Sequence, residues 1–219
     1  MVLAGLLGVT TVAACSSAIQ QSASGTTASN TPRGPSASAS SRLSPALPYT
    51  PADVHFMAGM IPHHAQAVLI AGWAPTHGAR ADVRTLCERI VVAQRDEINL
   101  MQGWLRDRHE TVPDANATRM TMKMDGMTHD MLMPGMLTDA ELAKLDSARG
   151  PAFDRMFLQS MIRHHEGAIS MVDELSGAFG ARQDEVVFRF SSDVYADQTT
   201  EIERMQKMLA ATPGGGLDK

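Results

Sequence analysis

The chain is short of the residue types that several functional classes need. Only two cysteines occur among its 219 residues, so no disulfide framework can hold the fold together. Aromatic residues make up 5% of the chain and its formal net charge is −5. A protein that stacks on bases or binds phosphates through a basic surface has the opposite composition. Nucleic acid is therefore not an expected partner.

The common catalytic motifs are also missing. The sequence contains no G-x-S-x-G, no H-E-x-x-H and no Glu-x-x-His, the tetrapeptide of di-iron carboxylate bundles. Cys87 falls inside an expected helix, where a buried apolar role fits better than that of a nucleophile. The sequence therefore favours a binding protein, with no enzymatic activity.

The chain is rich in methionine, with 16, and also carries eight histidines. Residues 53–64 and 154–165 align at an offset of 101 and share Asp, Phe, Met, Ile and two consecutive histidines. A second block, beginning at Gln94, recurs from Gln198 at an offset of 104. Two blocks in the same order at nearly the same offset indicate an internal duplication.

Each repeated block has the apolar spacing of a helix. Thr50 and Pro51 form a helix start, and a Thr-x-x-Glu capping box at Thr138 begins a short helix over 140–148. No segment alternates convincingly with the period of a strand. We expect an all-α fold, a ferritin-like antiparallel four-helix bundle made of two duplicated hairpins. The long helices are expected to start at Pro51 and end near Pro75, then to cover about 81–108, 151–176 and 183–211.

The N-terminal region has the organisation of an exported, tethered protein. Residues 1–15 form an apolar run that closes on Val-Ala-Ala-Cys, typical of a signal peptide with a lipobox, and Cys15 would carry the lipid. Residues 16–50 are a Ser/Ala/Thr/Pro-rich stalk, 51–212 the folded domain and 213–219 a flexible tail. The expected location is the cell membrane, lipid-anchored on its extracellular or periplasmic face. An ordinary secretory signal with an incidental cysteine is the alternative.

The histidines of the repeats are candidate metal ligands. Met60 and His64 are four residues apart and share a helix face, so they can chelate one ion. His64 and its repeat equivalent His165 become neighbours if the hairpins pack about a pseudo-two-fold axis, whereas the preceding histidine of each pair points about 100° away. The alternative is a set of neutral core histidines bonded to glutamate. The candidates are Met60, His63, His64, Met161, His164 and His165, with Glu97 and Glu201 as the partners that orient them.

The loop between the hairpins, residues 117–137, is a second candidate site. Seven methionines fall within 17 residues, and Gly126, Pro134 and Gly135 interrupt any helix. The M-x-M-x-M spacing would place three thioethers on one side of an extended strand. Thioether sulfur is a soft neutral ligand that suits Cu(I). A flap that closes hydrophobically over the bundle is the alternative. The candidates are Met120, Met122, Met124, Met127, His129, Met131, Met133 and Met136.

Both repeats resemble the bacterial family called "domain of unknown function 305". The resemblance covers about 51–211 and implies a ferritin-like four-helix bundle in a secreted or membrane-tethered protein. Some members of that family are associated with copper binding or copper tolerance in the periplasm. It rests on the paired His-His blocks and on a Q-x-x-E-I-x-x-M pattern: Phe56, Met60, Ile61, Pro62, His63, His64, Gln66 and Ala67; Asp154, Phe157, Met161, Ile162, His164, His165, Glu166, Gly167, Ala168 and Met171; Gln94, Glu97, Ile98, Met101, Gln198, Glu201, Ile202 and Met205.

Three functions follow from these patterns. The first is a lipid-anchored extracytoplasmic protein that buffers or carries copper, as Cu(I), through methionine and histidine. The second is a surface interaction module whose histidines belong to the core and bind no metal. The third is a metal-dependent enzyme, against which the missing motifs argue. The expected partners are a metal ion and the membrane.

Overall fold

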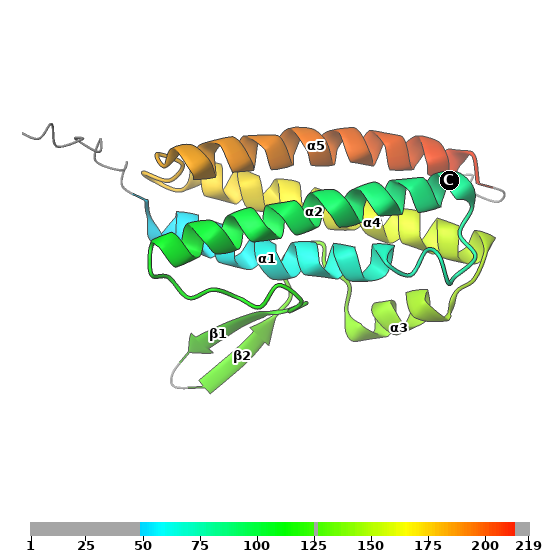
Figure 1. The fold of residues 1–219 in the computed structure, drawn as a ribbon, viewed down its shortest axis with the longest axis horizontal. Helices are drawn as coiled ribbons and strands as arrows, with labels where there is room; N and C mark the ends of the chain where they lie inside the picture. The colour runs from blue at the N-terminus through cyan, green and yellow to red at the C-terminus, as the bar shows by residue number, and fades with distance from the viewer. Residues whose placement is uncertain (1–48, 125–126, 213–219) are drawn as a thin grey trace, which may run out of the picture. The chain divides into compact units, whose positions relative to one another are not determined.

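A computed structural model describes residues 49–124 and 127–212. The predicted signal peptide, Cys15, most of the stalk and the tail lie outside these residues. Five helices and two strands form the described part (Figure 1): α1 Pro51–Ala71, α2 Ala81–Asp107, β1 Met120–Met124, β2 Met127–Met131, α3 Asp139–Ser147, α4 Pro151–Gly177 and α5 Glu185–Ala210.

The four long helices pack as two hairpins joined face to face. α1 packs along α2, α4 packs along α5, and the hairpins meet where α1 contacts α4. The prediction of a mainly helical fold made of two duplicated hairpins is confirmed. In the part of the chain that is described, no helix is both long and apolar enough to cross a membrane.

Polar side chains begin the helices where the sequence predicts. Thr50 accepts from the backbone N–H of Asp53, and the Asp53 carboxylate accepts from the backbone of Thr50, which completes a capping box at α1. Thr138 and Glu141 form the predicted capping box of α3. Such reciprocal bonds satisfy N–H groups that the first helical turn leaves unpaired.

Two buried aspartates at equivalent positions lock the hairpins together. Asp53 of α1 accepts from the backbone N–H of Arg182, at 2.8 Å, in the turn between α4 and α5. Asp154 of α4 accepts from the backbone N–H of Arg80, at 3.3 Å, in the turn between α1 and α2. Each hairpin therefore anchors the turn of the other, which explains why the aspartate recurs in both repeats.

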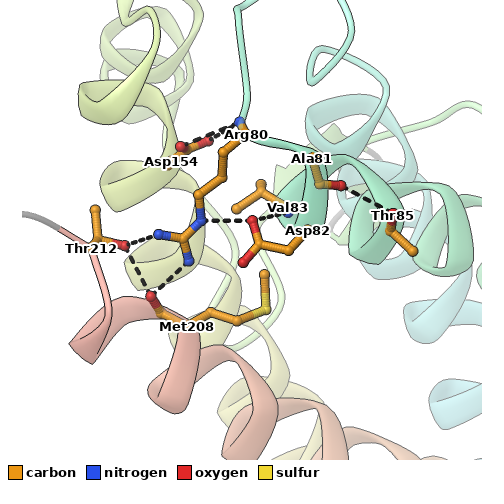
Figure 2. Close-up of polar contacts among 8 residues, drawn as sticks. All are labelled: Arg80, Ala81, Asp82, Val83, Thr85, Asp154, Met208 and Thr212. Carbon is orange, nitrogen blue, oxygen red and sulfur yellow. Dashed lines mark hydrogen bonds and ion pairs between the residues drawn. The ribbon is translucent and has the colours of Figure 1, made fainter.

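The turn at Arg80 is also tied to the end of the chain's last helix. Figure 2 shows its guanidinium donating to the carbonyl of Met208 at 2.7 Å and to the hydroxyl of Thr212 at 2.8 Å. The same side chain pairs with Asp82 at 2.7 Å. One arginine thus links the first turn, the start of α2 and the end of α5.

The region between the hairpins contains two strands, the first of which is the M-x-M-x-M segment that the sequence placed in an extended strand. β1 and β2 pair antiparallel, with Met120 opposite Met131 and Met124 opposite Met127. The alternation of methionine with polar residues is a strand pattern, but it covers only five residues on each side and is easily overlooked. After β2 the chain returns and packs Met133 against α1, where an added Cβ on Gly59 would lie 2.7 Å from its methyl carbon.

Candidate metal centre

Four histidines meet at the contact between α1 and α4. All four are 0% exposed. The rings of His63 and His164 approach across the contact, with centroids 3.8 Å apart. Within each helix the consecutive rings lie 6.2 Å apart. The helices therefore bury a row of imidazoles in the interior, where water does not reach them. The four are His63, His64, His164 and His165.

The ring of His63 is oriented by the returning loop. Its Nε2 lies 3.0 Å from the carbonyl oxygen of Pro134. A carbonyl oxygen only accepts, so Nε2 carries the proton and Nδ1 keeps a free lone pair. The loop can approach because residue 167 is glycine: a Cβ there would overlap the Pro134 carbonyl. A backbone contact therefore selects the tautomer of this histidine.

The second histidine of each pair is held by a glutamate of its own hairpin. His64 Nε2 lies 2.8 Å from Glu97 Oε2, and His165 Nε2 lies 2.7 Å from Glu201 Oε2. These glutamates occupy matching positions on α2 and α5. A carboxylate that contacts Nε2 favours the tautomer protonated at Nε2. The lone pair of Nδ1 is then free to bind a metal ion.

The opposite nitrogens of these rings have no partner. Nδ1 of every histidine in the row is buried without a hydrogen bond to any described residue, and His164 has no partner at either nitrogen. Buried side-chain nitrogens are normally paired, so an unpaired group requires an explanation such as a bound ion. The donor set fits a metal: imidazole lone pairs on four rings, three of which are held at Nε2 by Pro134, Glu97 or Glu201.

Burial also keeps the rings of His63 and His164 neutral. Burial and the neighbouring His64 together lower the pKa of His63 to about 3. Burial and the facing His63 ring hold the pKa of His164 well below its usual range. A neutral imidazole needs no deprotonation before it binds a metal, so these rings are ready as ligands at neutral pH.

The ring pair that meets between the hairpins is not the one expected from the sequence. We expected His64 and His165 to be neighbours there, but the rings in contact are His63 and His164. The contact face between α1 and α4 includes the first histidine of each pair. The second, about 100° further round, faces the glutamate of α2 or α5. Helix spacing gives the angle between the two rings, but which ring faces the other hairpin depends on how the hairpins dock.

The predicted sulfur ligands are spread over different environments. Met60 and Met161 are fully buried and lie in separate core clusters. Met127, Met131 and His129 are exposed on the β-hairpin. Only the backbone positions of Met122 and Met124 are described.

Three loop methionines lie nearer the helices. The sulfurs of Met120 and Met133 both lie within 3.5 Å of the position that a Cβ of Gly59 would occupy, and Met136 Sδ lies 3.2 Å from the backbone nitrogen of Met133. Met133 directly precedes Pro134, whose carbonyl orients His63. The five loop methionines whose side chains are described are therefore divided between the exposed β-hairpin and the surface of the helices.

The arrangement restricts the ions that the described side chains could bind. Within residues 49–124 and 127–212, no three His, Cys, Asp or Glu side chains are gathered closely enough to hold one metal ion. Zinc in proteins usually takes four ligands. Monovalent copper and silver have filled d shells and accept as few as two. A pair of imidazole nitrogens therefore suits a monovalent ion.

Sequence reasoning did not find the Pro134 carbonyl, the glycine at 167 that admits it, or the glycine at 59 that admits the Met133 side chain. Gly59 and Gly167 are interior positions of α1 and α4, where glycine is unfavourable unless another group must approach. Glycine at these two interior helix positions was the feature of the sequence that could have indicated a close approach by another group. Cys87 is buried, and burial raises the pKa of its thiol to about 12, so it is neither a nucleophile nor a ready metal ligand.

Comparison with known proteins places this domain in a family. Residues 53–209 match the family model described as "Domain of unknown function (DUF305)". The chain belongs to the DUF305 family. A DUF305 protein of Streptomyces coelicolor, described as secreted, has a crystal structure that aligns with a TM-score of 0.62 and 29% identity, covering 74% of this chain and 94% of that one.

Metal-bound structures are also similar to this DUF305 domain. CopM in its Cu(I)-bound form aligns with a TM-score of 0.55 and 25% identity over 75% of this chain and 98% of CopM. CopM has also been solved in Cu(II)-bound and Ag-bound forms. The uncharacterized protein L153 of Acanthamoeba polyphaga mimivirus is 32% identical over 56 residues, so the match spans 26% of this chain and 37% of that relative.

Proposed function

We propose that this DUF305 protein binds monovalent copper outside the cytoplasm and acts as a buffer or carrier. The observation that carries the proposal is the row of buried histidines whose Nδ1 atoms lack a partner. Leaving them unpaired destabilises the apo protein, which a purely structural row would avoid. The proposed ligands are imidazole nitrogens of His63, His64, His164 and His165, with Glu97 and Glu201 orienting two of the rings.

The ion is proposed to be Cu(I) for two reasons. A buried site with neutral ligands and few donors disfavours a doubly charged ion, which would be costly to desolvate. Neutral nitrogen and thioether ligands also suit soft ions. Copper bound to CopM in a similar fold supports the same metal here.

The methionine-rich loop is proposed to collect the ion. Exposed thioethers at Met127 and Met131 are accessible to solvent, whereas the sulfurs of Met120 and Met133 lie beside Gly59 of α1, one turn before His63. A path of weak sulfur ligands leading to stronger nitrogen ligands would deliver copper inward. The predicted lipid at Cys15 and the stalk would hold this domain at the outer face of the membrane.

An anaerobic Cu(I) titration against a competing chelator tests this proposal. We expect tight binding by the wild-type protein and loss of that binding in the double variant His63→Leu/His164→Leu. The seven loop methionines changed together to leucine should slow copper loading while leaving the equilibrium affinity close to wild type. The matched control is His55→Leu, an exposed histidine on the same helix.

Each other outcome has a definite meaning. If affinity falls in the methionine variant and survives in the histidine variant, the binding site is the loop. If neither the wild type nor any variant takes Cu(I) from the competing chelator, the protein is an interaction module with core histidines. Either result contradicts the proposed histidine site.

A further inference from the structure

The last part of the methionine-rich loop, residues 133–137, forms a strap that lies against both α1 and α4. Gly135 has a φ of +76°, a left-handed conformation that favours glycine, and an added Cβ there would overlap the carbonyl oxygen of Arg163 in α4. Met136 and Leu137, which follow it, are buried. The strap therefore covers the two helices at the level of the histidine row.

Gln66 of α1 holds this strap by its backbone. Its amide nitrogen donates to the carbonyl oxygen of Leu137 at 2.9 Å, and its amide oxygen accepts from the backbone N–H of Leu137 at 2.7 Å. Gln66 and Leu137 are both 0% exposed, so water does not compete for either bond. One turn earlier on α1, the Pro134 carbonyl of the same strap meets Nε2 of His63. The reciprocal pair of bonds at Leu137 therefore fixes where that carbonyl lies.

The two repeats differ at the position that the strap contacts. Gln66 aligns with Gly167 at the offset of 101, although the preceding histidines, His63 and His164, are identical. Gln66 binds the strap, whereas Gly167 leaves the space that the Pro134 carbonyl occupies. A glutamine at 167 would block the strap, and a glycine at 66 could not hold it. The strap can therefore bind in one orientation only, with its carbonyl toward His63.

This asymmetry makes two equivalent histidines chemically different. His63 donates its Nε2 proton to the strap and keeps a lone pair on Nδ1, whereas His164 has no hydrogen-bond partner among the described residues at either nitrogen. If the proton of His63 moved to Nδ1, that nitrogen would lose the lone pair that a metal ion needs. The position of the strap thus decides which nitrogen of His63 can act as a ligand.

We propose that Gln66 is a positioning residue of the metal centre, which clamps Leu137 and thereby holds the Pro134 carbonyl on Nε2 of His63. It acts through the strap and does not itself bind the ion. Groups that orient a metal ligand commonly contribute about 10–100-fold to affinity. The inference rests on the proposed copper site, but the tautomer of His63 is a property of the metal-free protein and is measured independently of copper.

The test is an NMR measurement of histidine tautomers in the metal-free protein, with hydrogen exchange at the Leu137 amide. In the wild type we expect His63 protonated at Nε2 and a protected Leu137 N–H; loss of a signal in His63→Leu identifies the ring. Gln66→Leu should abolish the protection of Leu137 and leave His63 as a mixture of tautomers. The matched control, Gln94→Leu, makes the same change at a buried glutamine of α2 and should keep both wild-type signals.

A second variant displaces the strap without changing Gln66. Gly167→Ala places a Cβ against the Pro134 carbonyl and should produce the same mixture of His63 tautomers. In a Cu(I) titration against a competing chelator, Gln66→Leu and Gly167→Ala should each bind at least about tenfold more weakly than the wild type. Gln94→Leu should bind like the wild type.

An unchanged His63 tautomer in both strap variants would overturn the proposal. A changed tautomer with wild-type Cu(I) affinity would overturn it as well, because Gln66 would then position a ring that the ion does not use. Failure of the wild-type protein to take Cu(I) from the chelator would instead refute the proposed function. In that case the metal-free spectra still decide whether Gln66 positions His63.

Discussion

Two buried histidine environments in this molecule differ in one respect. His77, in the turn after α1, is 4% exposed and has partners at both ring nitrogens: Thr76 at 3.0 Å from Nδ1, and Asp146 at 2.9 Å from Nε2. His164, in the row between α1 and α4, is 0% exposed and has a partner at neither nitrogen. Burial is nearly the same, and hydrogen bonding is opposite.

This difference in hydrogen bonding distinguishes a histidine that stabilises the fold, His77, from one whose nitrogens are available to a ligand, His164. His77 forms hydrogen bonds with polar groups near its turn and stacks on Trp73, with ring planes 15° apart. The histidine row leaves lone pairs pointing into a dry interior, an arrangement that destabilises the apo protein. Retaining it in both repeats is consistent with a ligand that fills those positions.

The largest effect is expected on copper affinity. His63→Leu/His164→Leu should weaken Cu(I) binding by more than about 100-fold, or about 2.7 kcal/mol, because loss of a direct ligand exceeds the 10–100-fold effect of losing an orienting partner. His77→Leu should retain wild-type affinity, since neither of its nitrogens is available. Chelator competition measures both. Equal losses of Cu(I) affinity in the two variants would show that the histidine row and His77 do not differ as metal ligands.

Apo stability should fall as the pH drops below 6.5. The pKa of His63 is lowered to about 3 in the folded protein and returns to about 6.5 on unfolding. Between those values the unfolded chain binds a proton that the folded chain does not, so each such histidine destabilises the fold by about 1.4 kcal/mol per pH unit of acidification.

Urea unfolding at pH 6.5 and 5.5 measures this slope, which His164→Leu should reduce. Arg163 lowers the pKa of the Glu141 carboxyl to about 2, so this group contributes to acid sensitivity only below about pH 4.5. A stability that does not change across this range would show that the row is solvated or already charged.

A glycine substitution tests the loop that orients His63. Gly167→Ala places a Cβ against the Pro134 carbonyl and should destabilise the protein by about 1–3 kcal/mol. The control is Gly103→Ala in α2, where an added Cβ meets nothing within 4 Å and the better helix propensity should stabilise by up to about 1 kcal/mol. Opposite signs in thermal unfolding are expected. A neutral Gly167→Ala would mean that the loop does not press on α4.

The smallest effect concerns apo stability alone. His77→Leu leaves polar groups of its turn unpaired and should destabilise by about 1 kcal/mol. His164→Leu replaces unpaired nitrogens with apolar surface and should leave the stability unchanged or raise it. Denaturant unfolding of the metal-free proteins compares the two. Destabilisation of similar size in both would make the histidine row a structural core.

Much of the fold could be predicted because its determinants are local. The apolar spacing, the Thr50 and Thr138 capping boxes and the internal duplication gave the helices to within a few residues, except that α1 ends at Ala71, before the predicted Pro75. The sequence indicated the extended segment that forms β1 but not its pairing with β2, because ten residues of weak alternation do not stand out from the general methionine richness of the loop. Sequence patterns therefore predict a helix well where the capping residues and the apolar spacing indicate the same boundaries.

The site was predicted less completely because it depends on docking. The sequence indicated all four histidines and their glutamate partners, and the structure shows the glutamates in contact with His64 and His165. Which ring faces the opposite hairpin follows from the rotation of α1 against α4, which no spacing rule contains. The Pro134 carbonyl is a backbone group, and its role becomes visible only when the loop is placed on Gly167.

X-ray absorption at the copper edge, on protein loaded with one equivalent of Cu(I), tests the central claim most directly. We expect a first shell of nitrogen at low coordination number, with the outer-shell scattering of imidazole. That spectrum should be unchanged when the seven loop methionines are replaced by leucine. A first shell of sulfur in the wild-type protein would contradict the account and place the copper in the methionine-rich loop.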